Sequence, residues 1–250
     1  MEQLFKGKVA LVTGAGSGIG EAVALLYADG GAKVIVSDVN ETHGAKVVAS
    51  IKEKGGEASF VKCDVSNPED CRALVDKTLE LYGRLDIACN NAGIGGEAKP
   101  IADYSIDTYQ KVIGVNLNSV FYGMKYQLPA MLKSGGGAIV NISSILGVVG
   151  SANAAAYVAA KHGVIGLTET AAAEYSAKGI RVNAVCPGYI NTPLLDMMDA
   201  TAKAALVGLH PIGRLGKTSE VAELVVWLSS DKASYVTGGK YLVDGAYTAV

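Results

Sequence analysis

The chain has 250 residues, 50% of them hydrophobic, which is enough to bury one large core in a single α/β domain covering residues 1–250. Its 22 Lys and Arg against 24 Asp and Glu give a formal charge of -2 without a basic patch, which argues against nucleic acid as a partner. No apolar run approaches the ~20 residues that cross a bilayer, so we expect no membrane association. The first residues lack the pattern of a secretory signal, which predicts a cytoplasmic protein.

Short β-branched runs recur along the chain and predict buried parallel strands. Segments of helical length and period separate them, including Glu21 to Gly30, Glu41 to Lys54, and Pro68 to Tyr82, which opens with proline and two acids. This alternation predicts a doubly wound parallel sheet of the Rossmann type, with helices on both faces. The predicted strands cover residues 9–12, 34–36, 58–61, 85–88, 138–142, 180–185 and 240–243.

Cysteine and histidine patterns predict no metal site. The four cysteines form no Cys-x-x-Cys pair and have no histidine at ligand spacing, so we expect buried, unpaired thiols. The three histidines are scattered, and we assign none of them to catalysis. These residues are Cys63, Cys71, Cys89, Cys186, His43, His162 and His210.

A glycine-rich turn joins the first predicted strand to the following helix. It places free backbone N–H groups and the positive end of a helix dipole beside an anion, which suits a pyrophosphate. The spacing is G-x-x-x-G-x-G rather than the general dinucleotide fingerprint. The predicted cofactor-binding residues of this turn are Gly14, Ser17, Gly18, Ile19 and Gly20.

Asp38 ends the second predicted strand, 18 residues after Gly20. A carboxylate there accepts hydrogen bonds from both ribose hydroxyls of NAD and repels the 2′-phosphate of NADP. Neither the turn nor the residue after Asp38 supplies an Arg or Lys for that phosphate. The sequence therefore predicts NAD(H) in preference to NADP(H).

Tyr157 and Lys161 lie four residues apart in an alanine-rich stretch, so they share one face of a predicted helix. A phenol with a pKa near ~10 is a poor base at neutral pH, and a nearby ammonium favours its ionised form. Ser143 and Ser144 end the fifth predicted strand, at the sheet edge that faces a ligand crevice. The grouping predicts acid/base chemistry at Tyr157.

Taken in order, these motifs resemble the short-chain dehydrogenase/reductase family in its compact form of ~250 residues, from Gly7 to Gly245. They are Thr13-Gly14 to Gly20, Asp64-Val65, Asn90-Asn91-Ala92-Gly93, Asn116, Ser144, Tyr157 with Lys161, Arg181-Val182-Asn183, and Pro187-Gly188 with Thr192. The pattern is most similar to bacterial NADH-dependent carbonyl reductases and secondary-alcohol dehydrogenases.

The resemblance implies a catalytic set of four residues. Tyr157 would donate or accept the proton, Ser144 would hold the substrate oxygen, Lys161 would bind the nicotinamide ribose and tune Tyr157, and Asn116 would anchor a relay water. It also implies that Asp64 and Val65 face adenine and that Ile190 and Thr192 hold the carboxamide. Further cofactor-binding residues implied are Asn90, Ala92, Gly93, Pro187 and Gly188.

The resemblance also implies the strand order 3-2-1-4-5-6-7 and a homotetramer. The segment Ser219 to Leu228 carries a broad apolar face that fits an interface and fits burial within the subunit equally well.

Residues near 188–212 are expected to form a mobile lid over an apolar pocket. The aliphatic character of this segment and of the residues near Ser144 predicts a neutral, hydrophobic ketone or secondary alcohol as substrate. The predicted pocket residues are Ile94, Ile145, Leu146, Tyr189, Leu194 and Met198.

Two alternatives remain open at this stage. A 3-oxoacyl-thioester reductase would share the fold and the catalytic residues, although such enzymes commonly use NADP, against which Asp38 counts. A dinucleotide-binding scaffold without turnover would have no need for the complete catalytic set.

Overall fold

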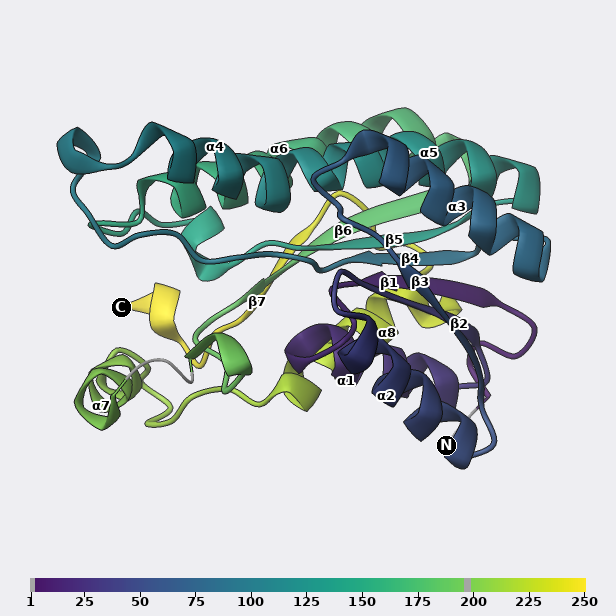
Figure 1. The fold of residues 1–250 in the computed structure, drawn as a ribbon, viewed down its shortest axis with the longest axis horizontal. Coiled ribbons are helices and arrows are strands. Elements are labelled where there is room, and N and C mark those ends of the chain that lie inside the picture. The colour runs from purple at the N-terminus through teal and green to yellow at the C-terminus, as the bar shows by residue number, and fades with distance from the viewer. Residues whose placement is uncertain (1–2, 196–198) are drawn as a thin grey trace.

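A computed structural model describes residues 3–195 and 199–250 and shows a seven-stranded parallel sheet between two layers of helices (Figure 1). The strand order is β3-β2-β1-β4-β5-β6-β7, which confirms the predicted topology. The strands are β1 (Val9–Thr13), β2 (Lys33–Asp38), β3 (Glu57–Lys62), β4 (Ile87–Asn90), β5 (Gly137–Ile142), β6 (Ile180–Pro187) and β7 (Lys240–Val243).

The helices divide between the two faces of the sheet. One layer contains α1 (Gly18–Asp29), α2 (Glu41–Glu53) and α8 (Thr218–Ser229) (Figure 1). The other contains α3 (Pro68–Tyr82), α4 (Ile106–Ile113), α5 (Ser119–Ser134) and α6 (Ala155–Tyr175). A short helix, α7 (Ala200–Gly208), lies apart from both layers at the left of Figure 1.

The central strands are mostly apolar because both of their faces are covered. Leu11 of β1 packs into the α3, α5 and α6 side of the core, whereas the adjacent Val12 packs into the α1, α2 and α8 side. This alternation follows from successive strand residues pointing to opposite faces of a sheet. Val221, Val225 and Leu228 of α8 are buried in the core, so most of the apolar face of this helix packs within the subunit.

Local signals fix several helix ends. The side chain of Asn67 caps α3 by accepting a hydrogen bond from the backbone N–H of Glu69 at 3.0 Å, Pro68 occupies the first helical position, and Gly83 ends the helix with φ of 75°. The helix α1 begins at Gly18 rather than at the predicted Glu21, because the glycine-rich turn itself forms the first helical turn.

Within the described residues, no helix is long and apolar enough to span a membrane, and no three His, Cys, Asp or Glu side chains gather as metal ligands. The four cysteines are buried and unpaired, as predicted.

Candidate active site

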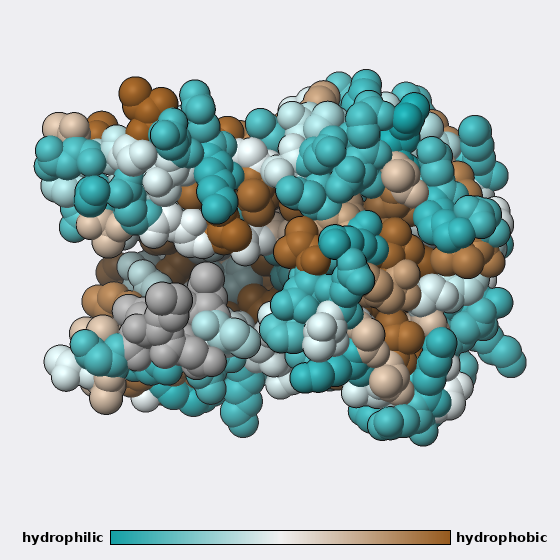
Figure 2. All heavy atoms as spheres, in the orientation of Figure 1, coloured by the Kyte–Doolittle hydropathy of each residue, from teal (hydrophilic) through white to brown (hydrophobic). Residues whose placement is uncertain are grey.

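A cavity of about 1030 Å³ opens at the carboxyl ends of the parallel strands. In the orientation of Figure 1, the space-filling surface is hollowed between the α4 region and the lower left part, with hydrophobic side chains inside (Figure 2). Loops from six strands meet there, because the carboxyl ends of parallel strands share one edge. The predicted site residues that line it are Gly14, Ser17, Gly18, Ile19, Asp38, Asp64, Val65, Ala92, Gly93, Ile94, Ser144, Ile145, Leu146, Tyr157, Lys161, Pro187, Gly188, Tyr189, Ile190 and Thr192.

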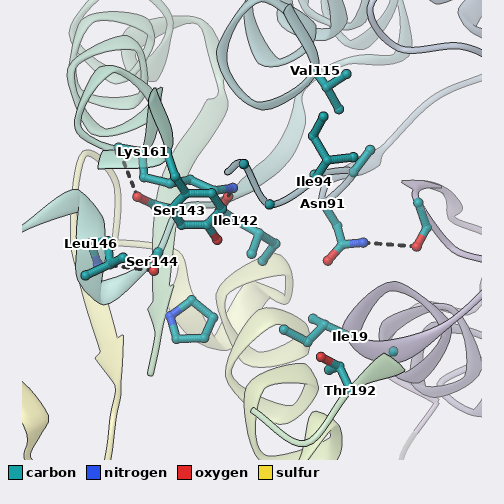
Figure 3. A pocket seen from close by; sticks show the side chains of 18 of the residues that line it. Ile19, Asn91, Ile94, Val115, Ile142, Ser143, Ser144, Leu146, Lys161 and Thr192 are labelled. Carbon is teal, nitrogen blue, oxygen red and sulfur yellow. Dashed lines mark hydrogen bonds between the residues drawn. The ribbon is translucent and has the colours of Figure 1, made fainter. Parts of the chain in front are cut away.

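The glycine-rich turn forms one end of the cavity. Gly14 and Gly18 have φ of 61° and 62°, which favours glycine at both positions. Ser17 precedes α1 but makes no side-chain capping hydrogen bond, so the N–H groups of the first turn keep their capacity for an external acceptor. Ile19 and Thr192 lie together beside this turn (Figure 3). The arrangement suits an anion such as a pyrophosphate.

Gly20, which was predicted to bind the cofactor, does not line the cavity and has a packing role. A side chain there would collide with the carbonyl oxygen of Gly14 and would lie 2.5 Å from the Asn91 amide nitrogen. That amide donates to the carbonyl oxygens of Thr13 and Gly14 at 3.0 and 3.1 Å, and Figure 3 shows one of these two bonds. Glycine at position 20 therefore lets α1 approach the end of β1 and keeps the turn in shape.

Asp38 lies at the end of β2 with its carboxylate held by the backbone. One oxygen accepts from the N–H of Gly16 and the other from the N–H of Asn40, both at 2.9 Å. Of the described residues that line the cavity, only Lys111 and Lys161 are cationic, and neither belongs to the turn or follows Asp38. The local charge at this end is therefore negative.

Asp64 and Val65 line the same end of the cavity, next to Cys63, which the sequence analysis did not assign to the site. The Asp64 carboxylate accepts from both the N–H and the hydroxyl of Ser66, at 2.9 and 2.7 Å. These bonds shape the loop after β3.

The position of Asn90 differs from the prediction. Its side chain is buried away from the cavity, where it exchanges hydrogen bonds with Gln127 and donates to Asn141 at 2.9 Å. Asn141 in turn donates to Thr168 of α6 at 3.0 Å. The Asn90 side chain therefore links β4 and β5 to the helices α5 and α6. Its place in the sequence did not indicate the direction of this side chain, because consecutive strand residues point to opposite faces.

Ser144, Tyr157 and Lys161 come together at the other end of the cavity. Ser144 follows β5, and its hydroxyl accepts from the N–H of Leu146 at 3.1 Å and lies near enough to the Tyr157 phenol to lower the pKa of that group. Tyr157 and Lys161 are one turn apart on α6, with the ammonium 5.6 Å from the phenol ring centre. Lys161 is 3% exposed and donates to the carbonyl oxygen of Ile142 at 2.8 Å.

The pKa directions at this end follow from burial. Burial raises the pKa of Tyr157, while the Ser144 hydroxyl acts in the opposite direction. Burial lowers the pKa of Lys161 to about 8. Lys161 is not among the groups that shift the Tyr157 pKa, and the loss of solvation on burial outweighs the effect of Ser144, so the predicted lowering by Lys161 stays a proposal.

Asn116 lies in a π-helical turn, Gly114–Asn118, between α4 and α5. Its buried side chain accepts from the N–H of Ile94 and donates to the carbonyl oxygen of the same residue, both at 2.8 Å. The side chain thus fixes the loop after β4, which carries Gly93 and Ile94 into the cavity. Each amide atom of Asn116 keeps one further hydrogen-bonding position, and the predicted relay water stays a proposal.

The substrate end of the cavity is largely apolar. Ile145 and Leu146 form one wall and Ile94 forms another, and Tyr189 lines the same cavity as Tyr157, whose pKa its phenol helps to raise. Two predicted pocket positions cannot be placed, since Met198 and the side chain of Leu194 lie outside what the structure describes. Lining residues that the sequence analysis did not name include Gly96, Glu97, Tyr104 and Asn153.

Comparison with known proteins shows the family. Residues 14–248 match a family model described as "Enoyl-(Acyl carrier protein) reductase". A cyclohexanol dehydrogenase from Acinetobacter sp. (strain SE19) is 53% identical over 249 residues, covering 100% of this chain and 98% of the relative. The chain belongs to the short-chain dehydrogenase/reductase family. It is therefore an oxidoreductase whose cofactor is a nicotinamide dinucleotide.

Two further relatives extend the comparison. A cis-4-hydroxycyclohexanecarboxylate dehydrogenase from Sinomonas cyclohexanicum is 45% identical over 251 residues and covers 100% of both chains. The crystal structure of a levodione reductase matches with a TM-score of 0.95 and 38% identity, over 98% of this chain and 99% of the other. The family assignment thus covers the fold as well as the sequence.

Proposed function

We propose that this short-chain dehydrogenase/reductase transfers a hydride between NAD(H) and a neutral, cyclic secondary alcohol or its ketone. The observation that carries the proposal is the grouping of Ser144, Tyr157 and Lys161 beside an apolar wall of the cavity. The named activity of the cyclohexanol dehydrogenase, which shares 53% of its residues with this chain, supports a six-membered ring as the substrate class.

The chain's own residues divide the chemistry between them. Bound nicotinamide supplies the hydride acceptor for alcohol oxidation. Ser144 and Tyr157 hold the substrate oxygen between two hydroxyls, and Tyr157 takes its proton. Because burial opposes ionisation of Tyr157, its interaction with the Ser144 hydroxyl is the contact that lowers its pKa, and the positive charge of Lys161, one helical turn away, would add to this once the site is filled. The aliphatic wall excludes water from the reacting atoms.

Asp38 supports NAD as the cofactor rather than NADP. Its carboxylate is fixed by two backbone N–H groups and faces the end of the cavity where the adenosine ribose is expected. A 2′-phosphate there would meet a fixed negative charge with no cationic partner among the described lining residues at that end.

The test is a coupled comparison of cofactors and substrates. Purified protein is assayed with cyclohexanol and NAD or NADP, with cyclohexanone and NADH, and with an acetoacetyl thioester and NADH or NADPH. We expect NAD-linked turnover of the ring alcohol and slower turnover of the thioester. Faster thioester reduction with NADPH would contradict the proposal and identify a 3-oxoacyl-thioester reductase.

Replacing Tyr157 with phenylalanine tests the mechanism and the scaffold alternative together. The variant keeps the ring but loses the proton acceptor, so kcat is expected to fall at least ~100-fold, the lower range for general acid/base catalysis. NADH affinity, measured by fluorescence titration, should stay within ~3-fold. Unchanged turnover in Tyr157→Phe would refute the assigned proton transfer.

We propose that the chain forms one domain around the single sheet and that four copies assemble into a homotetramer. The edge strand β7 exposes Leu242, and Trp227 of α8 and Tyr235 are 40% and 101% exposed, which fits association through this edge. Light scattering at several concentrations tests the assembly.

We also propose a cytoplasmic location. Four unpaired thiols and NAD chemistry fit the cytoplasm, which cell fractionation tests.

A further inference from the structure

His210 is buried directly behind the substrate wall, at the end of the segment expected to form the lid. Its ring is 4% exposed, and the sequence analysis gave it no role. Nδ1 lies 2.8 Å from the carbonyl oxygen of Leu206 in α7, and Nε2 accepts from the N–H of Tyr189 at 3.3 Å. One imidazole thus bridges the α7 segment and Tyr189, which lines the same cavity as Tyr157.

These two partners fix the state of the imidazole. The Leu206 carbonyl can only accept, so Nδ1 carries the hydrogen, and the Tyr189 N–H can only donate, so Nε2 offers its lone pair. The two hydrogen bonds therefore select the tautomer with the hydrogen on Nδ1.

The rings of His210, Tyr189 and Tyr247 pack against one another. The centre of the Tyr189 ring is 5.8 Å from that of His210 in an edge-to-face arrangement and 6.1 Å from that of Tyr247. His210 and Tyr247 are 5.4 Å apart. Edge-to-face aromatic pairs at these separations are favourable beyond their buried area. The rings of His210 and Tyr247, which do not line the cavity, thus pack against Tyr189, which does.

The surrounding backbone leaves the imidazole little freedom. A side chain at Gly188 would lie 2.9 Å from Nε2 of His210 and 3.0 Å from the Cα of Asp244. The carbonyl oxygen of Tyr189 accepts from the N–H of Gly216 at 3.0 Å, so the peptide groups on both sides of Tyr189 are held. The Asp244 carboxylate is turned to Ala246 and Thr248, which lowers its pKa.

We propose that His210 is a positioning residue that holds Tyr189 against the reacting centre and thereby sets the size of ring that the pocket accepts. This inference rests on the proposed function, because it assumes that a ring substrate lies between Tyr157 and Tyr189. His210 itself does not line the cavity and acts through Tyr189.

The experiment compares two alcohols, cyclohexanol and the bulkier 4-tert-butylcyclohexanol, in wild type and variants. His210→Phe keeps an aromatic ring and loses both hydrogen bonds, whereas His210→Gln retains an acceptor near Nε2. For His210→Phe we expect the KM for cyclohexanol to rise about tenfold, the equilibrium equivalent of one buried hydrogen bond. Its kcat should stay within ~3-fold, and the KM for the bulky alcohol should stay unchanged or fall.

Two more variants separate positioning from general stability. Tyr247→Leu removes a ring from behind Tyr189 without touching the hydrogen bonds of His210, and should shift selectivity in the same direction even if His210→Phe folds poorly. Ser229→Ala removes a buried hydrogen bond with Tyr27 at 2.7 Å, in the helix α8, and should leave the selectivity ratio unchanged.

The outcomes distinguish the two proposals. Positioning by His210 is supported if the ratio of the KM values for the two alcohols changes in His210→Phe and Tyr247→Leu. His210→Gln should then be closer to wild type, and NADH affinity should be unchanged. If KM rises equally for both alcohols, or for neither, in variants that remain active, the inference about His210 is wrong and the proposed function stands. Wild-type protein inactive with both alcohols overturns the proposed function, and the inference with it.

Discussion

Replacing Lys161 with methionine should change how the stability of the ligand-free protein depends on pH. Lys161 is 3% exposed and has one hydrogen bond, to the carbonyl of Ile142, so its charge is poorly solvated in the folded state. Burial lowers its pKa from 10.5 to about 8. Methionine keeps a long side chain of similar length and removes the titration.

The sign follows from proton linkage. Between pH 8 and 10.5 the unfolded chain binds a proton at Lys161 that the folded chain has released, so the free energy of unfolding rises with pH in this window. A difference of about 2.5 pKa units corresponds to about 3 kcal/mol in total, of which about 2 kcal/mol falls between pH 7.5 and 10. At pH values below the folded-state pKa of about 8, the buried Lys161 charge lowers the free energy of unfolding by a constant amount.

The assay is urea denaturation of wild type and Lys161→Met at pH 7.5, 8.5, 9.5 and 10, without cofactor. Other groups titrate equally in both proteins, so the difference between the two curves isolates Lys161. We expect wild type to gain about 2 kcal/mol relative to the variant across this range. Lys52→Met, on the exposed side of α2, serves as the control and should run parallel to wild type. Parallel curves for Lys161→Met would refute the assignment of a desolvated ammonium.

Three further substitutions test the cofactor end and the support below the site. Asp38→Asn keeps acceptor capacity but removes the charge, and should lower the KM for NADP at least ~10-fold in steady-state assays; an unchanged NADP/NAD ratio would count against the role of the carboxylate. Gly20→Ala places a methyl group against the Gly14 carbonyl and should lower both the melting temperature and NADH affinity, whereas a wild-type melting curve would show that the turn has room. Gln127→Leu leaves the Asn90 amide without its main partner and should cost about 2 kcal/mol in urea denaturation with NADH affinity intact; a loss of binding instead would return Asn90 to the cofactor site.

The elements of the fold were predictable because their signals are local. Both faces of β1 and β2 are covered, so these strands contain the apolar runs 9–12 and 34–36, and the limits of α3 are marked by Pro68 and Gly83. The start of α1 was placed too late, since a helical first turn made of glycine and isoleucine has no amphipathic pattern to detect. The strand order came from the family resemblance rather than from any spacing in the chain.

The sequence predicted which segments meet at the candidate site but not the direction of every side chain. Tyr157, Lys161 and Ser144 do converge, yet Asn90 and Gly20 turned out to support the cavity from outside it. Residue type and spacing indicate which segment reaches a site, whereas the direction of each side chain depends on what the neighbouring elements leave free.

The sequence by itself determined the doubly wound sheet, the glycine-rich turn before α1, the carboxylate after β2 and the pairing of Tyr157 with Lys161. Periodicity, glycine placement and a four-residue helical spacing are properties of short segments, so no distant contact was needed to recognise them. Only the tertiary structure decided that burial raises the pKa of Tyr157 and that His210 lies behind Tyr189. Solvation and side-chain packing depend on residues far apart in the chain, and these meet only when the sheet, the α7 segment and the C-terminal turn fold together.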